Sequence, residues 1–470
     1  MEKYLTTFLN EAAYNTFLNS EDCPYVNVSY ITSTDENKYY KQTSVNQLKP
    51  LTITISGLPT DTFIHHFYMR VTSDRETWGN KWFKVKINNN EWKQVWSTSD
   101  TNWDIRDFGI SKGESEDDGV YFENGDTIQF LGENIQKIEF MEVFETGDSP
   151  YSNTVRFTPS GNIYSPLTQD YAYGFPKGKN PANEPRVRGF AISHIWSANT
   201  GVNRYFVSDA SNLYLPTKGL EPYCFNALFQ GNPILTVAPD INATVIPALA
   251  CQDMFKECTA LTTMPVIAAK ALFTGSLATM FQSCTSLVNT TPLHVEKLYN
   301  GRAHFSGMFA GCTSLVTAPT WDVNWACEPY TGSRYTIDQN DWTEIFISTF
   351  SGCTSLTTCN WKMTKEAAFY NNYTFNTDSL LTTAPSISLG DVMNDTFDYG
   401  GMFNGCSSLT EIVAPKLKGE ISMGEFGDHA QSGIIYVHDE SRYLDSEDSL
   451  YGQTPIEGWT VKGISEYPSA

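Results

Sequence analysis

Phe309-Ala-Gly-Cys-Thr-Ser-Leu315 decides the fold of this chain, because the same pattern recurs through the second half of the sequence. The pattern reads Phe, two residues, usually Cys, two residues and Leu. It occurs seven times, beginning at Phe229, Phe255, Phe281, Phe309, Phe350, Phe375 and Phe403. Successive Phe residues are 26, 26, 28, 41, 25 and 28 positions apart. This period predicts a solenoid, in which each coil is too short to bury a core alone and must stack on its neighbours.

The positions of the pattern predict the structure of one coil. We expect Phe and Leu to point inward, and we expect a small side chain within a turn at the middle position. Cys fills that position at Cys258, Cys284, Cys312, Cys353 and Cys406, while Asn232 and Asp378 replace it in the other two copies. A Thr-rich run after Leu predicts one strand per coil, closed by Pro239, Pro265, Pro292, Pro319 or Pro385. The result is a mostly β solenoid with short helical turns.

The cysteines are interpreted as core residues. Five of the ten share one repeat position, which favours a buried column of small hydrophobic side chains. Disulfides between neighbouring coils are the alternative, but side chains at identical positions lie side by side without the rotation that a disulfide needs. No Cys-x-x-Cys pair occurs, and no metal site is expected.

Residues 50–164 lack the repeat and alternate with a period of two. The segments Leu51–Gly57 and Trp82–Ile87 predict strands with one apolar face, and three Asn residues at 88–90 predict a hairpin turn. Asn124-Gly125 predicts a second tight turn. Several short strands at this spacing indicate a β-sandwich.

Two features of this region leave their function open. Five tryptophans lie close together in sequence, at Trp78, Trp82, Trp92, Trp96 and Trp103. They could stack on sugar rings, or they could pack within the sandwich or against the end of the solenoid. An acidic run at Glu114, Glu116, Asp117 and Asp118 is either a calcium site or a solvated loop, and the ligand spacing of a known calcium loop is missing.

The two ends of the chain complete a four-part organisation. Residues 1–49 predict a docking arm with a short amphipathic helix and a strand. Residues 165–432 hold the solenoid, and residues 433–470 contain two predicted strands that suit a C-terminal cap.

Composition excludes several classes of function. The chain has 53 acidic and 31 basic residues and a formal net charge of −22, which disfavours binding to nucleic acid or to an anionic membrane. Apolar runs long enough to cross a membrane are missing, so membrane insertion is not expected. Motifs for nucleophilic, phosphate-binding, zinc or dinucleotide chemistry are also missing. We therefore expect neither an enzyme nor a cofactor.

The repeat resembles that of the BspA-like leucine-rich repeat proteins, which carry an Ala- or Met-Phe-x-x-Cys-x-x-Leu core followed by a strand and a proline. The copies at Met254-Phe255, Met280-Phe281, Met308-Phe309 and Met402-Phe403 fit this form. The resemblance covers roughly residues 224–417 and implies extracellular recognition or adhesion. The copy at Phe229 and the long step after Phe309 depart from the pattern.

The N-terminal segment resembles a segment shared by virion structural proteins of tailed phages that infect Bacteroides-group bacteria. The resemblance rests on Phe8–Asn15, Pro24–Tyr30 and Asn37–Tyr39. It implies a phage virion appendage of head or tail fibre type that serves host attachment. Its expected partners are other virion subunits, bound through the arm, and a host surface glycan or protein, while a homo-oligomer is left open.

A cell-surface adhesin of the BspA-like kind is the alternative. Residues 1–20 lack the pattern of a signal peptide, which favours the virion as the location over the bacterial surface. The alternative stays open because Met1 could begin a mature fragment.

The long step between Phe309 and Phe350 predicts a loop that projects from one face of the solenoid. Trp325, Tyr330 and Tyr335 are the candidate contact residues of this loop, because rigid aromatic side chains provide contact area at low entropic cost. The alternative is that Trp321 and Trp342 continue the core and that only the middle of the loop is exposed.

Overall fold

The computed structural model is mostly β and consists of two compact units, residues 1–245 and 246–470, each of which is described by itself. It describes residues 30–32, 39–41, 49–58, 64–73, 82–95, 101–104, 122–133, 135–145, 156–165, 207–217, 220, 222–299, 303–323, 327–328, 347–359, 362–363, 381, 386–387, 405–414, 432–437 and 458–468. Within these ranges no helix is long and apolar enough to cross a membrane.

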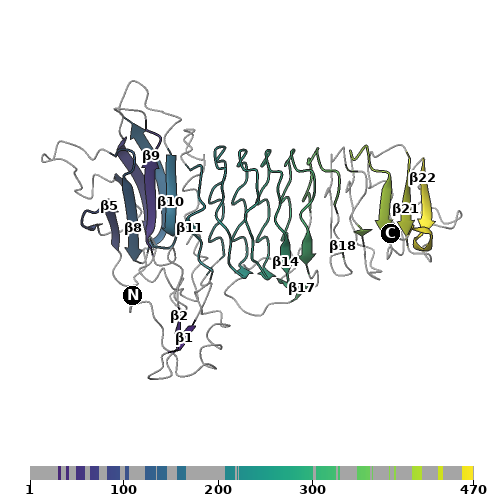
Figure 1. The fold of residues 1–470 in the computed structure, drawn as a ribbon, viewed down its shortest axis with the longest axis horizontal. Coiled ribbons are helices and arrows are strands. Elements are labelled where there is room, and N and C mark those ends of the chain that lie inside the picture. Colours follow the sequence, from purple (N-terminus) through teal and green to yellow (C-terminus); the bar gives the residue numbers. More distant parts are fainter. Residues whose placement is uncertain are drawn as a thin grey trace. The chain divides into compact units, whose positions relative to one another are not determined.

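The first unit contains a six-stranded sheet with the order β11-β10-β3-β8-β5-β6 (Figure 1). Its strands are β3 (Leu51–Ser56), β5 (Trp82–Ile87), β6 (Lys93–Val95), β8 (Thr127–Glu133), β10 (Arg156–Asn162) and β11 (Leu213–Tyr214). Neighbouring strands are antiparallel, except for the parallel pair of β10 and β11.

One face of this sheet is buried, as the alternating sequence predicts. Ile53, Phe83 and Phe130 have no exposed surface, and the rings of Phe83 and Phe130 stack with centroids 6.1 Å apart. The hairpin predicted after Ile87 is confirmed, because β5 turns at Asn88 and pairs with β6. The opposite face keeps Thr, Ser and Lys side chains that are only partly buried.

The two predicted turns of this region are tied to each other. Asn88 has a positive φ of 50°, and its side-chain amide donates a hydrogen bond to Asp126 Oδ1 at 2.7 Å. The Asn88 side-chain oxygen accepts a hydrogen bond from the Thr127 amide at 2.8 Å. Gly125 has φ +93°, which a residue without Cβ adopts at little cost, so the predicted Asn124-Gly125 turn is confirmed.

The first unit also contains two smaller sheets. One has the order β7-β4-β9 and consists of β4 (Ile64–Ser73), β7 (Thr101–Asp104) and β9 (Ile135–Glu145). The other pairs β1 (Tyr30–Thr32) with β2 (Tyr39–Lys41). Residues 1–29, which include the predicted helix of the arm, lie outside the described residues. The β-sandwich and the docking arm therefore remain predictions.

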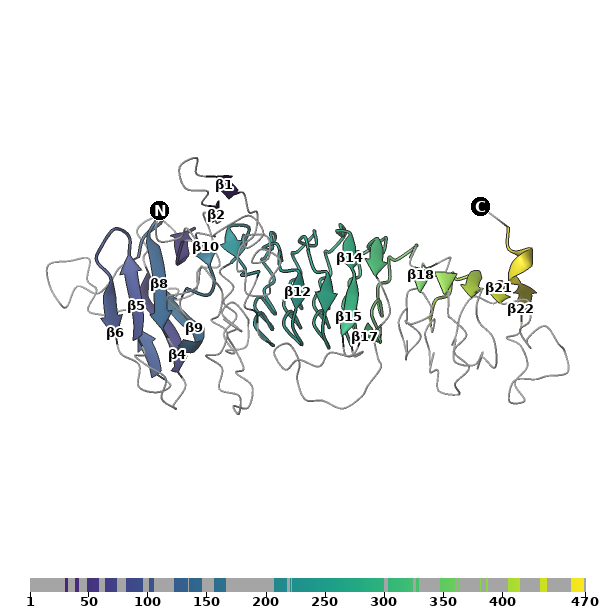
Figure 2. The same cartoon turned by 90° about the horizontal axis from the view of Figure 1, so that it is seen from below.

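The second unit is a β-solenoid (Figures 1 and 2). Its core contains the predicted Phe column. Phe255, Phe281, Phe309 and Phe350 are fully buried, and their rings stack one upon another at 5.5, 5.6 and 5.5 Å with interplanar angles of 4 to 11°. Leu261, Leu287, Leu315, Leu356, Leu381 and Leu409 are fully buried as well. The long step before Phe350 does not interrupt the column, because the Phe309 and Phe350 rings stack directly.

The middle position of the pattern is buried, as predicted. Cys258, Cys284, Cys312, Cys353 and Cys406 have no exposed surface, and the eight described cysteines of the chain form no disulfide bond. In the first unit Asn232 stands at the same pattern position and donates a hydrogen bond to the Val207 carbonyl at 2.8 Å, while its side-chain oxygen accepts one from the Ile234 amide. The polar substitution therefore bonds to backbone, as expected.

The expectation of short helical turns is wrong for the turn side, which we define as residues 249–258, 275–284, 303–312 and 347–353. These residues form successive tight turns, and none of them is α-helical. Every fourth residue has a positive φ, for example 53° at Thr279 and 60° at Ser283. Alternate amides point to the next coil, as Phe255 N does to Met280 O at 2.9 Å, so they cannot form the hydrogen bonds of a helix.

In the coils that contain Pro239, Pro265, Pro292, Pro319 or Pro385, the described strands lie after the proline, whereas the sequence predicted them before it. The strand Glu411–Ala414 is an exception, because it lies between Leu409 and Pro415. The run before Pro265 or Pro319 contributes only single bridges, such as that between Thr263 and Asn289. The strands are β12 (Val245–Ile246), β13 (Ala271–Leu272), β14 (Leu293–Val295), β15 (Lys297–Tyr299), β16 (Trp321–Val323), β17 (Cys327–Glu328), β18 (Lys362–Met363) and β19 (Ser386–Ile387). Side chains after Pro265 alternate between buried and exposed, whereas the two residues after Leu261, Leu287 and Leu315 are both exposed, which does not suit a strand with one buried face.

The two predicted C-terminal strands form and belong to a parallel sheet. Its strands are β20 (Glu411–Ala414), β21 (Gly433–Val437) and β22 (Trp459–Gly463), followed by the 3₁₀ helix η8 (Ile464–Glu466). Gly433 pairs with Trp459, 26 positions later, so this segment keeps the spacing of the coils. Tyr467 then reaches back, and its hydroxyl lies 3.5 Å from Glu411 Oε1.

Candidate recognition surface

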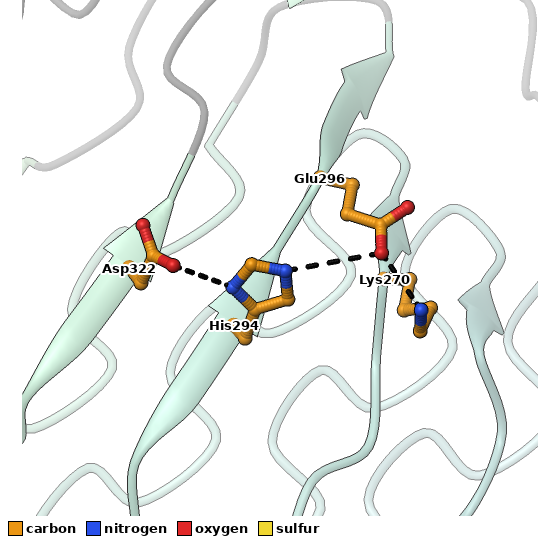
Figure 3. A network of polar contacts seen from close by, with 4 residues as sticks. All are labelled: Lys270, His294, Glu296 and Asp322. Atoms are coloured by element: carbon orange, nitrogen blue, oxygen red, sulfur yellow. Dashed lines mark hydrogen bonds and ion pairs between the residues drawn. The ribbon is translucent and has the colours of Figure 1, made fainter.

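Four charged or polar side chains lie in a row across three successive coils of the solenoid (Figure 3). They are Lys270, His294, Glu296 and Asp322, and we call them the polar row. His294 is the middle residue of β14, and Asp322 is the middle residue of β16. Lys270 directly precedes β13, and Glu296 joins β14 to β15. The row therefore belongs to the strand side of the coils.

Strand alternation explains why these side chains face the solvent. Leu293 and Val295 flank His294 and are buried, each with 1% of its surface exposed. Consecutive side chains of a strand point to opposite faces, so His294 must point outward. The parallel register then pairs His294 with Asp322 in the next coil.

The members of the row contact one another in sequence. His294 Nδ1 lies 2.7 Å from Asp322 Oδ2, and since an ionised carboxylate only accepts hydrogen bonds, Nδ1 carries the proton. His294 Nε2 lies 3.8 Å from Glu296 Oε1. The same Glu296 oxygen accepts a hydrogen bond from Lys270 Nζ at 2.7 Å. The ammonium group thus connects through one carboxylate to the imidazole and then to a second carboxylate.

The row is open to solvent, and one of its carboxylates is held ionised by a neighbour. The hydrogen bond and charge of Lys270 lower the pKa of Glu296, so this carboxylate stays ionised below the usual range. The side chains of Lys270, Glu296, His294 and Asp322 are 57, 48, 58 and 83% exposed. Ion pairs with this exposure contribute little to folding stability. The groups are therefore accessible to a ligand, and their ion pairs are expected to add little to folding stability.

The chemistry of the row is that of hydrogen bonding. A carboxylate bound to histidine also occurs in nucleophilic catalysis, where the other ring nitrogen faces a Ser or Cys. Here His294 Nε2 faces the Glu296 carboxylate, so the arrangement provides donors and acceptors and no activated nucleophile. Among the residues that the structure describes, no three His, Cys, Asp or Glu side chains form a metal site.

A second line of side chains runs beside the row. Val266, Pro292 and Thr320 are exposed, and we call them the flanking column. Pro292 lies two residues before His294, and Thr320 lies two residues before Asp322. Val266 occupies the same position one coil earlier, because the pairs Thr263–Asn289 and Ala271–Lys297 hold a constant offset on both sides of it. Its side chain is 48% exposed, so apolar surface borders the polar row.

The aromatic residues predicted from the long step lie outside the described residues. This holds for Trp325, Tyr330 and Tyr335 and also for Trp342. Trp321 is described, and its ring packs at 4.7 Å from the Phe305 ring and at 6.1 Å from the Phe309 ring. Trp321 thus packs on the core, while the same interpretation for Trp342 and the exposure of the middle of the loop stay predictions.

The tryptophans of the first unit divide between the described and the undescribed residues. Trp82 is half-buried on the face of the sheet opposite to Phe83, and Lys84 Nζ lies 4.4 Å from the centroid of its ring. Trp92 is half-buried too. Trp78, Trp96 and the acidic run at 114–118 lie outside the described residues, and only the backbone of Trp103, in β7, is described. The sugar-platform and calcium interpretations remain untested.

The sequence contained one unused signal for the polar row. Leu293-His-Val295 and Trp321-Asp-Val323 both alternate apolar and polar residues, which predicts an outward polar side chain in each strand. What places these side chains together is the register between coils, since His294 and Asp322 are 28 residues apart. The row was therefore missed.

Comparisons with known proteins add no family. No protein-family model matches the chain, and no curated protein and no solved structure matches it.

Proposed function

We propose that this chain is a non-catalytic recognition protein whose solenoid displays a binding surface. The observation that carries the proposal is the polar row, in which four exposed side chains from three coils are held on a fully buried aromatic and aliphatic core. A surface that adds little to stability but is held in place by rigid strands suits binding to another molecule.

The setting that we propose is a phage virion appendage built on a BspA-like leucine-rich repeat solenoid. Residues 1–49 act as the docking arm, residues 50–164 form a β-sandwich base, and residues 433–470 cap the solenoid. Two observations support this setting beside the sequence resemblances. The eight described cysteines form no disulfide bond, which suits assembly in a reducing cytoplasm before release by lysis. The buried Phe column matches the repeat that carries the resemblance.

Trp325, Tyr330 and Tyr335 extend the proposed surface. In the chain, Trp325 lies between the end of β16 at Val323 and the start of β17 at Cys327. It follows Asp322 by three positions, so the polar row and the aromatic candidates belong to consecutive stretches of sequence. The proposed partner is a host surface glycan or protein.

The decisive experiment combines virion composition with host attachment. Mass spectrometry of purified virions should find this protein, and virions in which Trp325, Tyr330 and Tyr335 are all replaced by Ser should attach poorly to host cells. Thermal unfolding of the purified variant is the control and should be nearly unchanged. Absence from virions together with presence on the bacterial surface would favour the adhesin instead. Unchanged attachment, or a collapse of stability, would remove the aromatic residues from the binding surface.

A further inference from the structure

We propose that the polar row and the flanking column bind a linear, uncharged polysaccharide whose chain lies along the stacking axis of the coils. This inference rests on the proposed recognition function and assigns the ligand class to the described part of its surface. It is carried by the regular spacing of the coils, by the apolar and polar division of the surface and by its charge.

The spacing of the coils suits a repeating ligand. Neighbouring parallel strands are about 4.8 Å apart, and this distance is close to the advance of a glycan chain per pyranose ring. Leu293, His294 and Val295 pair in register with Trp321, Asp322 and Val323, so equivalent positions of these two coils lie side by side. A chain lying across the strands would therefore meet one set of side chains per sugar.

The surface has an apolar part and a polar part, as a pyranose has an apolar C–H face and polar hydroxyl groups. The flanking column offers the methyl groups of Val266 and Thr320 and the ring of Pro292 to the C–H face of a pyranose. The polar row beside it offers two carboxylates, an imidazole and an ammonium group to the hydroxyl groups. Carbohydrate sites combine these two kinds of contact, with apolar area for burial and a few polar groups for orientation.

The polar groups are oriented before a ligand arrives. Asp322 holds His294 at 2.7 Å, and Lys270 holds Glu296 at 2.7 Å, so each carboxylate already has one fixed partner. A carboxylate can accept further hydrogen bonds from vicinal hydroxyls. Because the side chains are positioned on strands of a rigid stack, binding loses less side-chain entropy than it would on a loop.

The charge of the surface disfavours an acidic ligand. Glu296 and Asp322 face the solvent on a chain with a formal net charge of −22. An acidic polysaccharide would meet repulsion, both locally and from the whole chain. Direct contacts to hydroxyls carry no such penalty, so binding of an uncharged chain should depend little on salt.

The test uses the full chain and immobilised polysaccharides. Mannan, xylan and a linear β-glucan are the uncharged probes, and polygalacturonate is the acidic comparison. We expect binding to at least one uncharged probe, weak or absent binding to polygalacturonate, and little change when NaCl is raised. Asp322→Ala and His294→Ala should each weaken binding by about tenfold or more, as the loss of a hydrogen bond to a charged group does. Glu257→Gln, an exposed change on the turn side, is the matched control and should bind as the unchanged protein does.

Several outcomes would overturn the inference. They are the absence of binding to every uncharged probe, equal binding to polygalacturonate, and full binding by Asp322→Ala and His294→Ala. Capture of a host protein that depends on Asp322 and excludes polysaccharide would make the occupant a protein. If virions contain the chain and attach to cells while no polysaccharide binds, the inference fails and the proposed function stands. If the chain binds polysaccharide but is absent from virions, the inference stands and the proposed virion setting fails.

Discussion

Cys284 Sγ donates a hydrogen bond to the carbonyl oxygen of Phe255, which belongs to the preceding coil, at 3.0 Å. The same oxygen accepts the amide of Cys258, three residues further on, at 3.0 Å. Equivalent thiol bonds of 3.1 Å join Cys312 to Phe281 and Cys353 to Phe309. The Phe-x-x-Cys part of the repeat thus closes a turn through one amide and ties two coils together through one thiol.

Replacing Cys312 with Ala should lower the free energy of unfolding by about 1 to 2 kcal/mol, because the change removes a buried sulfur atom and its hydrogen bond. Chemical denaturation measures this loss. Cys312→Ser keeps a donor at the same position and is the matched comparison. If the Cys312→Ala variant and the unchanged protein unfold at the same denaturant concentration, the hydrogen bond of the thiol does not contribute to stability.

Leu315→Ala should cost about 2 to 5 kcal/mol, since Leu315 has no exposed surface and truncation leaves a cavity in a stacked core. The loss should spread to neighbouring coils, because solenoids are stabilised through nearest-neighbour contacts. Hydrogen exchange of the coils on either side would detect this spread. Val316→Ala is the control, because Val316 is 44% exposed and directly follows Leu315. An unchanged melting temperature for Leu315→Ala would contradict the register of the coil.

His304 makes the stability of the solenoid sensitive to acid. Burial lowers its pKa to about 4, and its Nε2 lies 3.1 Å from the Tyr299 carbonyl oxygen. The unfolded chain takes up this proton near pH 6.5 and the folded chain only near pH 4. Protonation of His304 therefore does not lower the free energy of unfolding above about pH 6.5. The loss of stability grows as the pH falls from about 6.5 to about 4, where it reaches roughly 3 kcal/mol.

The measurement that isolates His304 is the unfolding free energy between pH 7 and pH 4 for the unchanged chain and for His304→Gln. Glutamine does not titrate and can still donate to the Tyr299 carbonyl. The variant should therefore lose less stability than the unchanged chain as the pH falls. Parallel curves would show that His304 is protonated at the same pH in both states.

Deleting residues 1–49 should leave the rest of the chain folded but exclude it from particles. An amphipathic helix and an isolated pair of short strands gain little stability without a partner, so the arm is expected to fold on the assembly that it anchors. Circular dichroism checks the fold, and quantitative mass spectrometry of particles checks incorporation. Particles that contain the truncated chain at normal occupancy would disprove the anchoring role.

Burial was predictable from the sequence, but the conformation of the turns was not. The constant spacing of Phe, Cys and Leu was enough to predict which side chains fill the core, and those described are fully buried. The turn side was misjudged because Thr279 and Ser283 carry no local signal for a positive φ. Their conformation follows from hydrogen bonds to the next coil, such as that from Ser283 N to Ala310 O at 2.7 Å.

The polar row shows the same limit for function. Each strand could be read as apolar, polar, apolar, yet nothing local relates His294 to Asp322, which the parallel register alone pairs. Trp325, Tyr330 and Tyr335 were predicted as contact residues because they are aromatic and lie in the long step between Phe309 and Phe350. Their contacts stay a prediction. Periodicity therefore identified the core, whereas the exposed surface required the register between coils.

Alternate amides of the turn side donate hydrogen bonds to the next coil, and their peptide dipoles give the described turns a net dipole along the stacking direction. Phe255 N bonds to Met280 O, and Phe281 N, in the adjoining peptide, bonds to Met308 O, so the peptide units align head to tail from coil to coil. Aligned peptide dipoles add, as they do in an α-helix, with partial positive charge toward the side where the N–H groups point. For the described turns, the C-terminal end of the stack is the positive pole. A negatively charged group placed beyond that end would be stabilised, whereas the same group at the opposite end would be repelled.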